Sequence, residues 1–68
     1  MKHNSTVPIN MYPELERMVA EGELKVNRRA VVFENDGSLW ASYYKSGSDV
    51  LYTRRRYQNG NYDWYMLG

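Results

Sequence analysis

The stretch LYTRRRYQNGNYDWYML, residues 51–67, decides the fold because it contains two strand-like segments joined by a turn signal. Residues 51–57 and 62–67 are rich in aromatic and β-branched side chains, which favour strands. Between them, Asn59-Gly60 is a strong hairpin signal, because a primed two-residue turn needs positive φ at both central positions. The stretch therefore predicts an antiparallel hairpin whose first strand carries the triplet Arg54, Arg55 and Arg56.

Two further strand-like segments precede this hairpin, at residues 29–34 and 39–44. Asn35-Asp36-Gly37-Ser38 separates these two segments, and Ser46-Gly47-Ser48 precedes the hairpin strand. Links this short join antiparallel neighbours, because a parallel connection needs a crossover of a dozen or more residues. The four segments together predict a β-meander, in which each strand pairs with the next.

Residues 10–24, NMYPELERMVAEGEL, have the features of a helix. Pro13 suits the first helical position, Gly22 suits the C-terminal stop, and Leu15, Met18 and Val19 fall on one face. Residues 1–10 are polar and show no periodicity, so we expect a flexible N-terminal arm. The sequence thus predicts an α+β fold: an arm at 1–10 and one small domain at 11–68, with one short N-terminal helix packed on a four-stranded antiparallel β-meander.

Two-residue loops predict the strand register and therefore the two faces of the sheet. They place Arg56 opposite Asp63, Arg55 opposite Trp64, Arg54 opposite Tyr65, Phe33 opposite Trp40 and Tyr44 opposite Leu51. The more apolar face, which we expect the helix to cover, then collects Val31, Phe33, Trp40, Tyr44, Leu51, Thr53, Arg55, Trp64 and Met66. The other face collects Val32, Leu39, Ala41, Tyr43, Tyr52, Arg54, Arg56, Asp63, Tyr65 and Leu67.

Groups that perform catalysis are scarce in this chain of 68 residues. His3 is the one histidine and lies in the expected arm, and there is no cysteine to act as a nucleophile or metal ligand. No metal-ligand or phosphate-binding spacing occurs. No apolar run approaches the roughly 18 residues of a membrane span, and no signal peptide is visible at the start. We expect a cytoplasmic protein that is not an enzyme and uses no cofactor or metal.

The expected uncovered face is rich in tyrosine and arginine, the residue types that are enriched at binding hot spots. Its candidate partner-binding residues are Tyr43, Tyr52, Arg54, Arg56 and Tyr65. A structural role is the alternative for two of the three arginines: Arg56 could pair with Asp63, and Arg55 could lie over Trp64 and Trp40. Arg54 is therefore the arginine most expected to face a partner.

The net charge of +1 bears on the choice of partner. Residues 1–23 hold two basic and four acidic side chains, a net charge of −2, and the remainder has a net charge of +3. Because phosphate neutralisation drives nucleic-acid affinity, this balance favours a small regulator, adaptor or inhibitor that docks on a larger protein. Nucleic-acid binding through the same face is the first alternative. The second is a structural role or a homodimer through the C-terminal strand, taken as a sheet edge. Proteins of this size and type are common among phage accessory proteins, an association by size alone.

Overall fold

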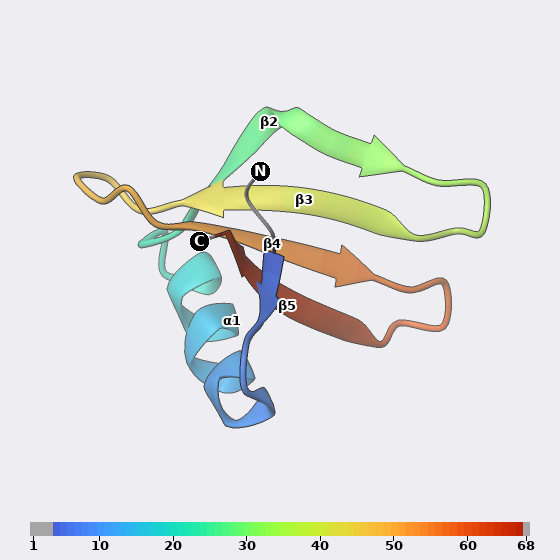
Figure 1. The fold of residues 1–68 in the computed structure, drawn as a ribbon, viewed down its shortest axis with the longest axis horizontal. Coiled ribbons are helices and arrows are strands. Elements are labelled where there is room, and N and C mark those ends of the chain that lie inside the picture. The colour runs from blue at the N-terminus through green and yellow to red at the C-terminus, as the bar shows by residue number, and fades with distance from the viewer. Residues whose placement is uncertain (1–3, 68) are drawn as a thin grey trace.

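The computed structural model describes residues 4–67, which form one α-helix and a five-stranded antiparallel sheet. In chain order the elements are β1 (Asn4–Thr6), the 3-10 helix η1 (Ile9–Met11), α1 (Tyr12–Ala20), β2 (Lys25–Phe33), β3 (Leu39–Tyr44), β4 (Leu51–Arg56) and β5 (Tyr62–Leu67). The strand order is β1-β5-β4-β3-β2 (Figure 1). The α+β class is confirmed and the expected meander is β2 to β5, but the sheet has a fifth strand.

The fifth strand comes from the segment expected to be a flexible arm. β1 pairs antiparallel with β5, with Thr6 opposite Tyr65, and the Val7 N–H donates to the Trp64 carbonyl at 3.1 Å. Val7 is 5% exposed and belongs to the core. Residues 1–3 of the expected arm lie outside the described residues. Because β1 covers β5, the expectation that the C-terminal strand is a sheet edge is wrong, and the edges are β1 and β2.

α1 begins and ends where the sequence predicts and packs on one face of the sheet. Leu15 is 1% exposed and clusters with Ala41, Tyr43 and Trp64 of the sheet. The helix ends in a Schellman motif, since the Glu23 N–H donates to the Met18 carbonyl at 2.8 Å. Gly22, with φ +79°, supplies the left-handed residue that this motif needs.

The β2–β3 and β4–β5 turns, which we call the two hairpin turns, have three-residue loops, and the expectation of two-residue loops there is wrong. In the β4–β5 turn, the Tyr57 N–H donates to the Asn61 carbonyl (2.8 Å) and the Gly60 N–H to the Tyr57 carbonyl (2.9 Å). Gly60 has φ +93°, which matches a type I turn followed by a glycine bulge. The β2–β3 turn repeats this pattern between Glu34 and Ser38. Each loop is therefore one residue longer than predicted.

That extra residue shifts the β2–β3 and β4–β5 registers by one position, so β3 and β4 change face relative to β2 and β5. Arg54 lies opposite Trp64, Arg55 opposite Asp63 and Arg56 opposite Tyr62. Between β2 and β3, Val32 rather than Phe33 lies opposite Trp40. The β3–β4 register is as predicted, with Tyr44 opposite Leu51. Because side chains alternate along a strand, the shifts place the predicted helix-side residues of β2 and β5 beside the predicted free-side residues of β3 and β4.

The helix consequently covers a face that combines the side of β3 and β4 expected to be free with the side of β2 and β5 expected to be covered. We call it the covered face; by register it holds Val31, Phe33, Leu39, Ala41, Tyr43, Tyr52, Arg54, Arg56, Tyr62, Trp64 and Met66. We call the opposite side the open face; it holds Val32, Trp40, Ser42, Tyr44, Leu51, Thr53, Arg55, Asp63, Tyr65 and Leu67. α1 lies toward one end of the sheet, and the two hairpin turns extend away from it at the other end (Figure 1).

Candidate binding surface

The five candidate partner-binding residues do not form one exposed face. Tyr43 is 6% exposed and Tyr52 is packed against the core, both beneath α1. Arg54 shares this covered face, Arg56 lies at its exposed end, and Tyr65 lies on the open face. The expected grouping is wrong because it rested on the two-residue loop at Asn59-Gly60.

Arg54 is the most enclosed of the three arginines. Its Nη1 donates to both carboxylate oxygens of Glu16, at 2.7 and 2.9 Å, and its Nη2 donates to the Tyr43 hydroxyl at 2.7 Å. The guanidinium also lies 5.2 Å from the Tyr43 ring centroid and 5.4 Å from that of Trp64, whose Nε1–H donates to Glu16 at 2.8 Å. The Arg54 side chain is only 15% exposed. It therefore joins the helix to the sheet, and the expectation that it faces outward is wrong.

Arg55 is held within the open face. Its guanidinium lies 5.0 Å from the Trp40 ring centroid and 4.6 Å from that of Tyr57. Nη2 donates to Asp36 at 3.2 Å and Nε donates to the Ser38 hydroxyl at 3.3 Å. The predicted contact with Trp40 is confirmed, whereas Trp64 lies on the other face. The pKa of Asp36 is lowered, chiefly by the Ser38 backbone N–H, then by the Ser38 hydroxyl, with Arg55 adding to the effect.

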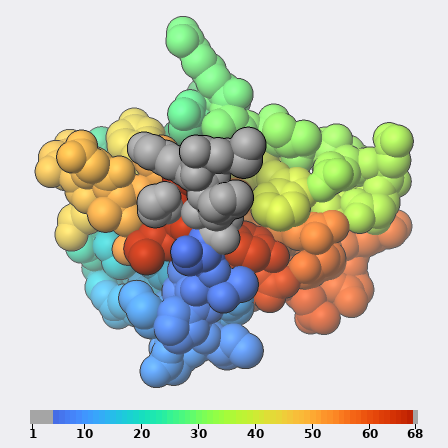
Figure 2. Space-filling view, viewed as in Figure 1, coloured from blue at the N-terminus to red at the C-terminus, as the bar shows by residue number. Residues whose placement is uncertain are grey.

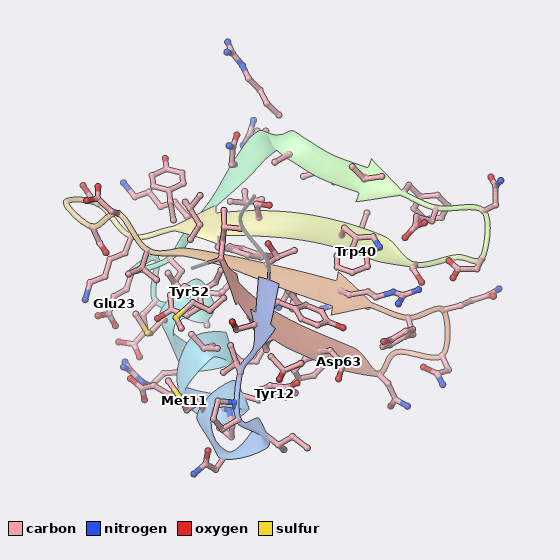
Figure 3. The ribbon with its side chains drawn as sticks, in the orientation of Figure 1. Met11, Tyr12, Glu23, Trp40, Tyr52 and Asp63 are labelled. Carbon is pink, nitrogen blue, oxygen red and sulfur yellow. The ribbon has the colours of Figure 1, made fainter. Side chains whose placement is uncertain are left out.

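The sequence predicted that Asp63 pairs with Arg56, but the structure places Asp63 opposite Arg55. It accepts hydrogen bonds from the Tyr57 hydroxyl at 2.6 Å and from the Tyr12 hydroxyl at 3.4 Å, so it ties the start of α1 to β5 (Figure 3). The bond to Asp63 raises the pKa of Tyr57 to about 12. Arg56 is exposed, and within residues 4–67 its side chain makes neither an ion pair nor a hydrogen bond, unlike those of Arg54 and Arg55.

The open face carries a second aromatic group, which joins Trp40, predicted on the helix side, to Tyr65, predicted on the free side. Trp40 and Tyr65 stack with ring centroids 5.7 Å apart, and the Trp40 Nε1–H donates to Glu34. Tyr44 and Leu51 lie opposite each other on the same face, beyond the Ser42–Thr53 pair, and are 39% and 37% exposed. Figure 3 places Trp40 toward the hairpin turns, well away from α1. The single α-helix of the described residues packs on the other face, so this aromatic surface is left without a helical cover.

A shallow depression lies beside the open face, between the two hairpin turns. It has a volume of about 410 Å³ and polar walls formed by Asp36, Ser38, Tyr57, Gln58 and Asn59. The turns touch here, since a Cβ added to Gly37 would lie 2.9 Å from the Gln58 Cβ. Three of the lining groups already bond within the sheet: Asp36, Ser38 and Tyr57. The depression therefore offers few free polar groups to a ligand.

Metal-ligand clusters and membrane-spanning helices are both absent from residues 4–67. No group of three or more acidic, histidine or cysteine side chains there could hold a metal ion. No helix in that range is long and apolar enough to cross a membrane.

The comparisons with known proteins identify no relative. No protein-family model matches this chain, and no curated protein or solved structure is significantly similar to it. A functional conclusion therefore depends on the surfaces described above.

Proposed function

We propose that this protein is a small non-enzymatic binding protein, a regulator, adaptor or inhibitor, that docks on a larger protein through the open face. The observation that carries the proposal is the stacked pair Trp40 and Tyr65, on the same uncovered sheet face as the exposed residues Val32, Tyr44 and Leu51. Of the five residues that the sequence suggested, Tyr65 is the one that remains in this surface.

The composition of the open face supports a protein partner. Aromatic and aliphatic side chains lie around a small central pair, Ser42 and Thr53, and the charged side chains lie toward the turns; aromatic residues are enriched at protein interfaces. The sheet also holds this surface in place, because Trp40 is fixed by Tyr65, Arg55 and Glu34. A preformed aromatic surface loses little conformational freedom on binding, which favours affinity.

The charges of the same face argue against nucleic acid. The open face and its adjacent turn hold two positive side chains, Arg55 and Lys25, and three negative ones, Glu34, Asp36 and Asp63. The Arg55 charge is already paired with Asp36. Since affinity for nucleic acid comes largely from cations that neutralise phosphates, the face lacks the groups that would supply it.

The test compares partner capture by matched variants. Tyr44→Glu places a charge in the open face, and Ile9→Glu places the same charge at a residue of η1 that is 77% exposed. We expect the wild type and Ile9→Glu to retain one protein from a lysate of the source cells that Tyr44→Glu loses. With that partner purified, calorimetry should give a dissociation constant at least tenfold weaker for Tyr44→Glu alone.

Two outcomes would overturn the proposal. Equal binding of the purified partner by both variants would move the binding surface away from the open face. Saturable changes in tryptophan fluorescence on adding single-stranded or duplex oligonucleotides, with a steep loss at higher salt, would replace the protein partner with nucleic acid.

A further inference from the structure

β2 forms one edge of the sheet, and its last three residues present apolar side chains to solvent. Val31, Val32 and Phe33 are 42%, 55% and 74% exposed. Upstream of them the pairing with β3 is interrupted, because Asn27 lies opposite Ser42 and Val31 lies opposite Ala41. The three residues between, 28–30, form a bulge, and this part of β2 projects from the body of the molecule (Figure 2). The edge also includes residues 25–27, where Lys25 supplies a charge, and bulges and charges protect sheet edges. Residues 31–33 are therefore the less protected part of this edge.

The free backbone groups of this edge follow from the turn. The Glu34 N–H donates to the Ser38 carbonyl at 2.8 Å, so this pair is a hydrogen-bonded pair of the β2–β3 ladder. Hydrogen-bonded and non-hydrogen-bonded pairs alternate along an antiparallel ladder. Val32 therefore directs its N–H and C=O toward β3, whereas Val31 and Phe33 direct theirs outward, where β2 has no neighbouring strand.

We propose that a second copy of this chain pairs antiparallel along β2, with the two-fold axis between the two Val32 residues. In this register Val31 of each copy lies opposite Phe33 of the other, and their outward N–H and C=O groups form the new ladder bonds. Val32 faces its own counterpart in a non-hydrogen-bonded pair on the open face. The three most exposed positions of the edge are thereby covered together.

The charges on either side of Val32 select this partner and this register. Arg28 and Arg29 precede the apolar segment, and Glu34 and Asp36 follow it. Antiparallel pairing about Val32 brings the bulge of each copy, which carries Arg28 and Arg29, toward the acidic end of the other copy, which carries Glu34 and Asp36. Pairing about residue 29 would instead oppose the arginines of the two copies, which is destabilising. The edge is thus complementary to itself in one register.

The resulting dimer would be weak and would have a defined shape. Three paired residues a side bury far less than the roughly 800 Å² per partner of a standard interface, so the dimer should form reversibly at high concentration. Edge pairing makes one continuous sheet, whose two-fold axis is perpendicular to it. Both open faces therefore lie on the same side of the dimer. This surface is separate from the one assigned to the larger partner, so either proposal can fail without the other.

The absence of native cysteine allows a direct test of the register. Three single variants are made, Val31→Cys, Val32→Cys and Phe33→Cys, and each is equilibrated in a glutathione redox buffer at high protein concentration. Facing residues in a non-hydrogen-bonded pair have Cα atoms about 4.5 Å apart, within disulfide range, whereas residues offset by two positions lie about 7–8 Å apart. We expect Val32→Cys to form most of the disulfide dimer, and Val31→Cys or Phe33→Cys alone to form at least fivefold less.

An equimolar mixture of Val31→Cys and Phe33→Cys should recover cross-linking, as a mixed dimer identified by its mass. Sedimentation equilibrium of the uncross-linked protein gives the second measurement: Phe33→Glu should weaken dimerisation at least tenfold, and Ile9→Glu should leave it unchanged. Equal cross-linking of all three cysteine variants would overturn the proposed register. A monomeric mass for the wild type at millimolar concentration would overturn the dimer itself.

Discussion

The two faces of the sheet contain similar residue types and differ in how the fold uses them. On the covered face, Arg54 lies between Tyr43 and Trp64 and pairs with Glu16 beneath the helix. On the open face, Arg55 lies over Trp40 and pairs with Asp36, whose side chain is 58% exposed. Neighbouring arginines in one strand thus have different roles. The helix excludes water from one contact and leaves the other hydrated, and this determines how much each contributes to stability.

The largest expected difference between the faces is that between their tryptophans. Trp64 is 0% exposed and lies at the centre of the core, so Trp64→Ala should cost about 3–5 kcal/mol. A core of this size supplies about that much in total, so the variant should be unfolded at room temperature. Trp40→Ala removes a half-exposed ring and should cost about 1–2 kcal/mol. Circular dichroism with urea unfolding measures both; equal losses would contradict the division into a covered and an open face.

The arginines provide the next comparison. Arg54→Met leaves the Glu16 carboxylate, which is 30% exposed, without its cation, so the loss should be about 2 kcal/mol, below that of a fully buried pair. Arg55→Met breaks a more hydrated pair and should cost less than about 1 kcal/mol. For a domain this small, a difference of about 1 kcal/mol separates the two melting temperatures by about 4–8 °C. A lower melting temperature for Arg55→Met would reverse the comparison.

The glycines of the two hairpin turns test the loops that determine the faces. Gly60→Ala places a side chain at φ +93° with no atom within 4 Å and should cost about 1 kcal/mol. Gly37→Ala adds a collision with Gln58 at 2.9 Å and should cost about 1 kcal/mol more. The double variant Gly37→Ala with Gln58→Gly should recover only this second part. Thermal unfolding measures all three variants; no recovery would show that the turns do not press against each other.

The helix and four of the strands could be predicted because their signals are local. Leu15, Met18 and Val19 repeat at helical spacing, and the glycine turns bound the aromatic segments. β1 could not be predicted in this way, since Asn4-Ser5-Thr6 is short and polar and is a strand only through its pairing with β5. The cores of the four meander strands were predicted, although β2 begins at Lys25 rather than at residue 29, and the partners across two of the three meander turns were displaced by one position.

This displacement explains why the candidate site was assigned to the wrong side. Asn59-Gly60 is compatible both with a primed two-residue loop and with a three-residue loop that ends in a glycine bulge. Local sequence does not distinguish the two, yet the choice decides whether Arg54 lies opposite Tyr65 or Trp64. The choice also decides which residues of β3 share the helix side with Trp64, and the longer loop places this ring with Tyr43 and Ala41.

The smallest predicted effect concerns the ionisation of Tyr57 on the open face. The hydrogen bond to Asp63 is the main cause that raises the pKa of Tyr57 from 10.0 to about 12, followed by burial and the Asp63 charge, while Arg55 opposes the shift. Because the folded state has the higher pKa, this stabilisation is complete below pH 10 and is lost as the pH rises toward 12. NMR titration of labelled tyrosine rings measures the pKa, and Asp63→Asn should return it toward 10 while Tyr57→Phe identifies the signal. An unchanged pKa in Asp63→Asn would mean that the phenol is held by another group, and the link from Tyr57 through Asp63 to Tyr12 would lose its support.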